Sequence, residues 1–343
     1  MSKWVIARTN KVTSSNWGIN LAAAVLGSVF LTHCGGTEPS DATQMGASAE
    51  EALGTQVRRP SNVPEDYVPT PVGWRHRSCV VSLGADETLA EDHIRKADGT
   101  KRQLTQCAHL AYDREGRAFD PATHSPQVNG WVASVSATST GPINYLSANW
   151  TVPQTPAAAT TQTLFYFPGV EPLATSDVIL QPVLAWNGFG DKAWTIASWA
   201  CCKYGNVYNS TPQNVASGDN LTGTVTGTSC GSGGVCANWS IVTKDSKNGK
   251  STTFTTVGGG EAMDWVFGGA MEIYGVDTCT QYPKNTSTRF SNIKTRTTSG
   301  TLVLPAFSAW AAGSSVSPNC NATFGSPQNS GTTASWLLSW SNK

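Results

Sequence analysis

Beyond residue 129 the chain alternates apolar and polar residues over short runs, with turn-forming residues between the runs. This alternation is typical of half-buried β-strands and does not fit the period of an amphipathic helix. Asn187-Gly188 and Ser217-Gly218-Asp219-Asn220 are turn signals between successive runs. The pattern predicts strands at residues 143–150, 163–167, 178–184, 193–200, 221–226, 237–243, 252–256, 265–276, 289–293, 301–307 and 334–340.

About a dozen strands without a convincing helix indicate an all-β fold, either a sandwich or a closed barrel. We favour a sandwich of two antiparallel sheets, with a cysteine-containing extension on its amino-terminal side. Gly, Ser, Thr, Asn and Trp are abundant, which fits strands and turns. Only 13% of the residues are charged and the formal net charge is zero, which argues against binding to nucleic acid or to an anionic membrane surface.

Four segments differ in composition. Residues 1–34 read as an export signal and residues 35–66 as a Gly-, Ser-, Thr- and Pro-rich linker. Residues 67–128 form an extension that holds four of the five histidines, and a short helix is expected at 85–96. Residues 129–343 form the predicted sandwich.

The amino terminus carries three basic residues before an apolar run at 19–31. That run is too short to span a bilayer and suits an export signal. It ends at Leu31-Thr32-His33-Cys34-Gly35-Gly36, which resembles a bacterial lipoprotein box with Cys34 as the lipidated residue. The alternatives are therefore an outer-membrane or cell-surface lipoprotein, attached only through its lipid, and a plain secreted protein.

The chain has nine cysteines, and lipidation of Cys34 leaves an even number for disulfides in an oxidising compartment. Cys230 and Cys236 could close a tight loop, while adjacent Cys201 and Cys202 could bond to each other or to other partners. Cys79 with Cys107 and Cys279 with Cys320 are further plausible pairs. No Cys or His spacing resembles a zinc site, so neither a metal nor another cofactor is expected.

Gln181 lies within the apolar run Val178–Leu184. Burying its amide without partners would cost on the order of 1–3 kcal/mol, so it should have a partner or face a cleft. A solvent-facing glutamine on the polar side of the strand is the alternative. Glu272 is similar, because it is the single charge in the strand-like segment 265–276.

A carboxylate in such a segment is paired, faces a groove, or has a pKa raised by burial. If Glu272 and Gln181 met across strands, the carboxylate could act as general base towards water while the amide stabilised an oxyanion. Glu272 could equally lie on an exposed strand face. Trp186, Trp194, Trp199 and Trp239 could line a substrate groove, although core packing is the usual role of tryptophan in a sandwich.

Several short motifs occur in one order: Trp150-Thr-Val-Pro153, Phe167-Pro-Gly-Val-Glu171, Ile179-Leu-Gln181, Ala193-Trp194 with Ser198-Trp199, Ala216-Ser-Gly-Asp219, and Ala270-Met-Glu272. In this order the motifs resemble the eqolisins, glutamic peptidases with a concanavalin A-like (jelly-roll type) sandwich. The resemblance implies a Gln/Glu dyad acting on water in acidic medium, with the family's glutamine at Gln181 and its glutamate at Glu272. It also implies that Glu171, with Trp186, Trp194 and Trp199, contacts the substrate.

The chain departs from the family at three places. Ala197-Ser198-Trp199 replaces an aromatic-Glu-Trp element, Phe167–Glu171 replaces Trp-Val-Gly-Ile-Asp-Gly, and Ile-Tyr-Gly-Val follows Glu272. The resemblance implies an exported, monomeric endopeptidase that acts on polypeptides, with residues 67–128 as a propeptide over the groove. The alternatives are a non-catalytic lectin-like sandwich that holds glycan, and a glycoside hydrolase that uses Glu272 with a second acid.

Overall fold

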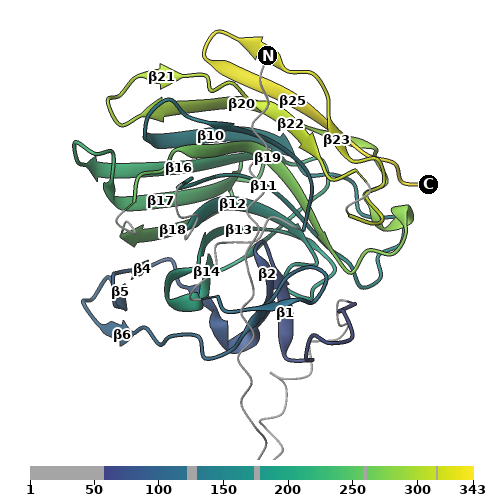
Figure 1. Cartoon of the computed structure of the whole chain (residues 1–343), viewed down its shortest axis with the longest axis horizontal. Helices are drawn as coiled ribbons and strands as arrows, with labels where there is room; N and C mark the ends of the chain where they lie inside the picture. Colours follow the sequence, from purple (N-terminus) through teal and green to yellow (C-terminus); the bar gives the residue numbers. More distant parts are fainter. Residues whose placement is uncertain (1–57, 122–129, 174–177, 258–260, 314–315) are drawn as a thin grey trace, which may run out of the picture. The chain divides into compact units, whose positions relative to one another are not determined.

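A computed structural model of the chain describes residues 58–121, 130–173, 178–257, 261–313 and 316–343 (Figure 1). In these ranges the regular structure is β-strand, apart from three short 3₁₀ turns, η1 (Arg77–Cys79), η2 (Lys203–Gly205) and η3 (Cys279–Gln281). The predicted all-β class is confirmed. The export signal at 1–34, with Cys34, and most of the linker at 35–66 lie outside the described residues, and so does His124.

Two large sheets form the sandwich. In the twelve-stranded sheet the path runs through β23 (Thr323–Phe324), β25 (Thr333–Ser339), β20 (Ser287–Thr297), β10 (Ile143–Thr151), β16 (Asn220–Cys230), β17 (Cys236–Asp245), β18 (Ser251–Val257), β4 (Glu87–Leu89), β5 (His93–Lys96) and β6 (Lys101–Gln103). Two short strands complete it: β21 (Leu302–Val303) pairs with β20, and β24 (Gln328–Ser330) pairs with β25.

In the nine-stranded sheet the path runs through β22 (Ser308–Ala311), β9 (Trp131–Thr138), β19 (Trp265–Tyr274), β11 (Thr163–Glu171), β12 (Ile179–Trp186), β13 (Trp194–Cys201), β14 (Val207–Ser210) and β3 (Val80–Leu83), while β15 (Gln213–Val215) pairs with β13. Nearly all pairings within the sandwich are antiparallel. The strands of the extension that join it, β3 on β14 and β4 on β18, pair in parallel.

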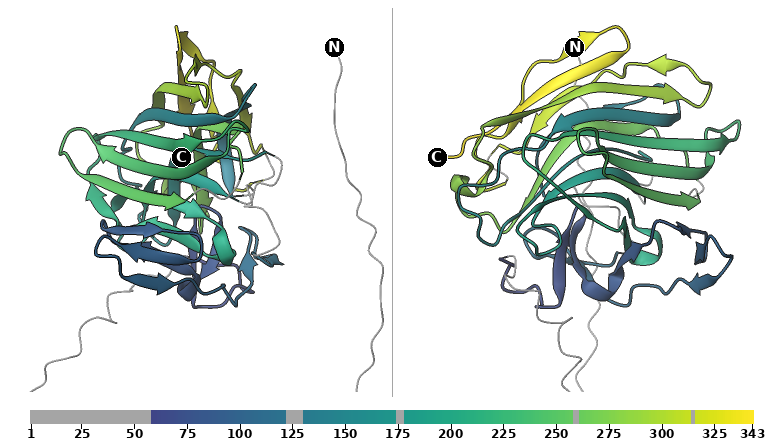
Figure 2. Two further views of the ribbon diagram at one scale, coloured as in Figure 1. Left: turned by 90° about the vertical axis from the view of Figure 1, so that its left-hand side faces the viewer. Right: turned by 180° about the vertical axis from the view of Figure 1, so that it is seen from behind.

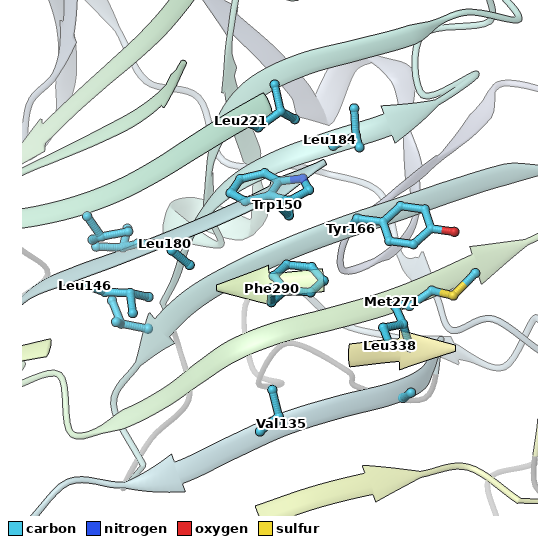
Figure 3. Packing of buried hydrophobic residues seen from close by; sticks show 14 of the residues in the cluster. Val135, Leu146, Trp150, Tyr166, Leu180, Leu184, Leu221, Met271, Phe290 and Leu338 are labelled. Atoms are coloured by element: carbon cyan, nitrogen blue, oxygen red, sulfur yellow. The ribbon is translucent and has the colours of Figure 1, made fainter. Parts of the chain in front are cut away.

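The main core lies between the two sheets. Figure 3 shows Trp150 and Phe290 from the twelve-stranded sheet beside Tyr166, Leu180 and Met271 from the nine-stranded sheet. These side chains are at most 2% exposed. Burial of aromatic and aliphatic surface on facing strands is the main stabilising term of such a sandwich.

The two sheets differ in how their outer faces are covered. Along β16 buried and less buried residues alternate, as expected when one face of a sheet meets solvent. Every residue of β11, β12 and β13 is buried. The nine-stranded sheet is therefore covered on both faces, by the other sheet and by a second layer.

That second layer is the amino-terminal extension, coloured purple to blue at the lower end of the sandwich in Figures 1 and 2. It forms a small sheet in the order β1 (Tyr67–Thr70), β2 (Gly73–His76), β7 (Ala111–Tyr112) and β8 (Ala118–Phe119). Val63, Tyr67, Val72 and Trp74 pack on side chains from the outer face of the nine-stranded sheet. These include Trp131, Phe165, Phe167, Ile179, Val183, Trp199, Phe267 and Tyr274, and we call the whole set the outer cluster.

The rest of the extension is built into the sandwich. Its strands β3 and β4 lengthen the two large sheets, and Leu83, Leu89 and Ile94 lie in the main core. All described residues consequently belong to one compact unit. The change near residue 129 is a change in composition, and it is not a boundary in packing.

Most of the predicted strands have ends within one to four residues of observed ones, but β9, β14 and β22 were not predicted. Two predictions are wrong. The expected helix at 85–96 is wrong, because this segment forms β4 and β5. β4 takes its partner from β18, through Thr88 opposite Thr255 and Leu89 opposite Thr256. The strand expected at 301–307 is reduced to Leu302–Val303.

Four disulfides lie in the described residues: Cys79–Cys107, Cys201–Cys202, Cys230–Cys236 and Cys279–Cys320. The predicted pairs Cys79–Cys107, Cys230–Cys236 and Cys279–Cys320 are confirmed. The adjacent cysteines, Cys201 and Cys202, bond to each other. Four disulfides are typical of a protein that folds in an oxidising compartment. No helix in the described part of the chain is long and apolar enough to cross a membrane.

Candidate functional site

The outer face of the nine-stranded sheet carries the polar residues that the sequence singled out. Gln181, Glu171 and Glu272 lie on strands β12, β11 and β19, which are adjacent in the order β19-β11-β12. Side chains alternate between the two faces of a strand, and neighbours of these three residues, such as Val183, Phe167 and Tyr274, belong to the outer cluster. All three polar side chains therefore lie on the outer face of the nine-stranded sheet.

Gln181 is 1% exposed, and among the described residues its Nε2 atom has no hydrogen-bond partner. It lies directly opposite Trp199 on β13. On the other side, the register that sets Val170 opposite Leu180 brings Gly169 opposite Gln181. An unpaired buried amide costs about 1–3 kcal/mol, so the fold retains this group at the expense of stability.

Glu171 is 3% exposed, and within the part of the chain that the structure describes its Oε2 atom has no hydrogen-bond partner. Burial raises the pKa of Glu171 to about 8. In the same register Glu171 falls opposite Ile179, which makes it the diagonal neighbour of Gln181. Diagonal residues on adjacent strands have Cβ atoms about 7 Å apart, within reach of two long side chains. Glu171 and Gln181 are thus diagonal neighbours on one face of the sheet, and among the described residues each has one polar side-chain atom without a hydrogen-bond partner.

Gly169 lies opposite Gln181 on the neighbouring strand, two positions before Glu171 on β11. There is no room for a side chain at this position. A Cβ atom at this position would lie 2.3 Å from the Phe267 ring and 2.7 Å from the Leu180 carbonyl oxygen. The Phe267 ring therefore covers the backbone at the point where Gln181 and Glu171 approach.

Substitution of Gly169 by alanine is expected to destabilise the protein by about 1–3 kcal/mol, because Phe267 would have to leave its position. Thermal unfolding followed by circular dichroism measures this as a fall in melting temperature. Gly218→Ala is the control for loss of glycine itself, since nothing lies within 4 Å of a Cβ there, although its φ of +83° adds some strain. A Gly169→Ala melting temperature equal to that of the wild type would contradict the packing described.

Glu272 is fully buried, and the Tyr274 hydroxyl donates a hydrogen bond of 2.5 Å to its Oε1 atom. Burial raises the pKa of Glu272 to about 8, and the Tyr274 hydrogen bond, the charge of Arg114 and the Trp131 side chain oppose this rise. The structure shows no hydrogen-bond partner for its Oε2 atom among the described residues. Gly130 lies against this carboxyl, since a Cβ there would be 2.5 Å from Oε1.

The predicted meeting of Gln181 and Glu272 does not occur. Glu272 lies opposite Phe165, and Phe165 lies opposite Ala185, four residues along β12 from Gln181. At about 3.3 Å per residue and about 4.8 Å per strand, the two backbones are roughly 16 Å apart. The residue of β19 level with Gln181 is Phe267, which lies opposite Gly169. Glu272 does share the outer face with Gln181, but it lies at a different level along the sheet.

The tryptophans divide between the two faces. Trp186 and Trp194 lie opposite each other in the main core, 4% and 2% exposed, and Trp239 is in the same core. Alternation along β12 and β13 turns Trp186 and Trp194 towards the other sheet, so the substrate contact predicted for these two is wrong. Trp239, on β17 (Cys236–Asp245), has the core-packing role that is usual for tryptophan in a sandwich. Trp199 is on the outer face, beside Gln181. The glycan-binding alternative therefore retains only Trp199 of the tryptophans it relied on.

Sequence reasoning assigned Glu171 to substrate contact and missed that it neighbours Gln181. Glu171 ends β11, and Gln181 is the third residue of β12, the next strand in the chain. Consecutive strands usually lie side by side, so the closeness of the two residues in the sequence was a signal. Within the described ranges no group of three or more His, Cys, Asp or Glu side chains is placed to hold a metal ion.

No family model and no curated protein matches the chain. Among solved structures it is similar to the Scytalido-glutamic peptidase with a peptide-based transition-state analogue, at 13% identity and a TM-score of 0.40 over 61% of this chain and 98% of that one. It is similar to SCP-B, of the eqolisin family, in complex with the tripeptide Ala-Ile-His, at 15% identity and a TM-score of 0.39 over 62% and 98%. The aspergilloglutamic peptidase of Aspergillus niger matches at 16% identity and a TM-score of 0.33 over 52% and 98%. The chain thus resembles glutamic peptidases at a distance, and likeness of this degree concerns the fold alone.

Proposed function

We propose that this protein is an exported endopeptidase of the glutamic type, in a covered form, with Gln181 and Glu171 as the pair that acts on water. The observation that carries this proposal is the diagonal placement of the two side chains on one sheet face, each with an unpartnered polar atom. The sequence motifs around both residues support it, since they are among those that resemble the eqolisins. Glu171 takes the role that the sequence had suggested for Glu272.

The proposed reaction is hydrolysis of a peptide bond. Glu171, ionised, accepts a proton from a water molecule as the water oxygen attacks the peptide carbonyl carbon. The Gln181 Nε2 group donates a hydrogen bond to the oxyanion that forms. Protonated Glu171 then passes the proton to the leaving nitrogen, the carbon–nitrogen bond breaks, and the acid and amine products separate.

The covered form is expected to be inactive for two reasons. A polypeptide cannot reach the pair, because Gln181 and Glu171 are at most 3% exposed. Burial also raises the pKa of Glu171 to about 8, so this carboxyl is protonated and cannot act as a base at neutral pH. Uncovering it would return its pKa towards the ordinary range, as catalysis requires.

Only part of the extension can leave without unfolding the sandwich. Strands β3, β4 and β5 contribute Leu83, Leu89 and Ile94 to the main core. The hairpin β1–β2, by contrast, contributes Tyr67, Val72 and Trp74 to the outer cluster and pairs only within the small sheet. We therefore expect activation to remove or displace the region up to His76, in place of the whole of residues 67–128.

The test is hydrolysis of denatured casein across acidic and neutral pH, before and after limited proteolysis or acid treatment. Activity is expected only once the region around β1–β2 is released, which mass spectrometry of the products would show. Gln181→Ala should abolish that activity, because the oxyanion loses its donor, while Gln154→Ala, at an exposed glutamine, should not. Full activity in Gln181→Ala, or no activity after clean release of β1–β2, would refute the proposal.

A further inference from the structure

A cleft of about 180 Å³ lies between the extension and the hairpin that joins β12 to β13. It is one strand away from Gln181, because Trp199, the cross-strand neighbour of Gln181, forms part of its wall. Its lining also includes Tyr67 of β1, Trp74 of β2, Phe189 of the β12–β13 connection, and two arginines, Arg59 and Arg77.

Aromatic rings dominate the walls. Phe189 stacks on Trp199 with ring centroids 5.7 Å apart and an interplanar angle of 30°. Tyr67 and Trp74 contribute from the extension. Phe189 is half-buried, while Trp199 and Trp74 are almost fully buried. A cavity of about 150 Å³ with apolar walls accommodates one benzene ring, so this cleft has room for a single aromatic group.

The rim of the cleft is cationic. Two arginines line it, Arg59 and Arg77, and no acidic residue does. Arg77 is exposed, and within the described ranges its guanidinium has no side-chain partner. Arg59 donates from Nε to the Val63 carbonyl oxygen, and its Nη2 atom lies 3.8 Å from the carboxylate of Glu65, which is 84% exposed. The Arg59 side chain is 13% exposed, but its partner Glu65 is largely solvated, and an ion pair of this length contributes little, so both guanidinium groups can bind an anion.

The hairpin that carries Phe189 is held in place from within the fold. Asn187 is buried with a φ of 55°, a conformation that asparagine tolerates better than most residues. Its Nδ2 group donates to the Gln162 carbonyl oxygen at 3.1 Å, and its Oδ1 atom accepts from the Lys192 amide at 3.1 Å. The wall formed by Phe189 is therefore preorganised, which lowers the ordering cost of binding.

We infer that this cleft binds an aromatic carboxylate, with the ring between the aromatic walls and the carboxylate on Arg77 and Arg59. Stacking accounts for selection of a flat ring, and the guanidinium groups account for selection of an anion. Two sources share this chemistry, a free aromatic acid and the carboxyl-terminal aromatic residue of a peptide. The inference does not require hydrolysis at Gln181 and stands whether or not the protein is a peptidase.

Isothermal titration calorimetry on the whole disulfide-bonded protein tests the inference. The probes are N-acetyl-L-phenylalanine, its amide, N-acetyl-L-leucine, phenylacetate and the tripeptide Ala-Ala-Phe. We expect saturable one-to-one binding of N-acetyl-L-phenylalanine, with the amide and the leucine analogue each about tenfold weaker or more. Phenylacetate as strong as Ala-Ala-Phe would identify a free acid as the ligand, and preference for Ala-Ala-Phe a peptide terminus.

Two variants locate the binding. Arg77→Gln should weaken binding of the acid about tenfold and leave binding of the amide unchanged, which separates loss of charge recognition from damage to the fold. Phe189→Ala should weaken both. Arg95→Gln, at an exposed arginine of β5 outside the cleft, is the matched control and should bind as the wild type does. Equal affinity for acid and amide, undiminished binding in Arg77→Gln, or no saturable binding at millimolar probe would overturn the inference.

Discussion

Glu171→Gln is expected to lower casein hydrolysis by the released protein about 10²- to 10⁴-fold, because the amide cannot accept a proton from water. The substitution keeps the size and shape of the side chain, so the fold should persist. Stability should not fall, since Glu171 is buried with its pKa raised to about 8 and is neutral in the covered form. Turnover of denatured casein, compared with the melting temperature of the same preparation, separates the two effects.

Glu272→Gln is the matched variant. Its carboxyl lies level with Ala185, four residues beyond Gln181, and Tyr274 occupies one of its oxygens. Activity close to that of the wild type is expected, because a glutamine can still accept the Tyr274 hydrogen bond. Loss of activity in Glu272→Gln with retention in Glu171→Gln would restore the assignment that the motif Ala270-Met-Glu272 suggested, and would mean that the sheet rearranges on activation.

The sandwich was predictable because its signal is local. In β16 and β17 the alternation of apolar and polar residues is a direct consequence of one covered and one solvated face. β4 and β5 were not predictable in this way. Glu87-Thr-Leu89 and His93-Ile-Arg-Lys96 are short and polar, and β4 becomes a strand by pairing with the edge of β18. That partner lies more than 160 residues away in the chain, so no local pattern indicates it.

The face of the sheet on which each candidate residue lies was also predictable, because the alternation of side chains along a strand is a local signal. Odd- and even-numbered residues of one strand point to opposite faces of the sheet. Gln181 and Trp186 could therefore be assigned to opposite faces of β12 from the sequence alone. The relation between Gln181 and Glu272 depends on two registers across β11, one of which shifts between Phe167 and Gly169. A register and its irregularities are set by packing across the sheet, and here Gly169 accommodates the ring of Phe267. The motif order could therefore indicate the face and not the partner.

The second large effect concerns the dependence of stability on pH. Glu171 and Glu272 have pKa values raised to about 8 by burial, from an ordinary value of 4.5. Between these two pH values the unfolded chain has released both protons while the folded chain retains them. The unfolded state then binds fewer protons, so the free energy of unfolding falls as pH rises, by about 1.4 kcal/mol per pH unit for each group. The stabilisation is complete below pH 4.5 and is lost as the pH approaches 8.

Glu272→Gln should remove about half of this slope, because its side chain is neutral in both states. Urea unfolding under non-reducing conditions at several pH values between 4.5 and 8 measures this slope. The free energy of unfolding of the variant should rise relative to that of the wild type as pH rises. Glu65→Gln, at a glutamate that is 84% exposed, is the control and should leave the slope as it is. A Glu272→Gln slope equal to that of the wild type would mean that this carboxyl is already ionised in the folded protein. Water would then already reach the Glu272 carboxylate, and with it the outer face of the nine-stranded sheet on which the proposed chemistry depends.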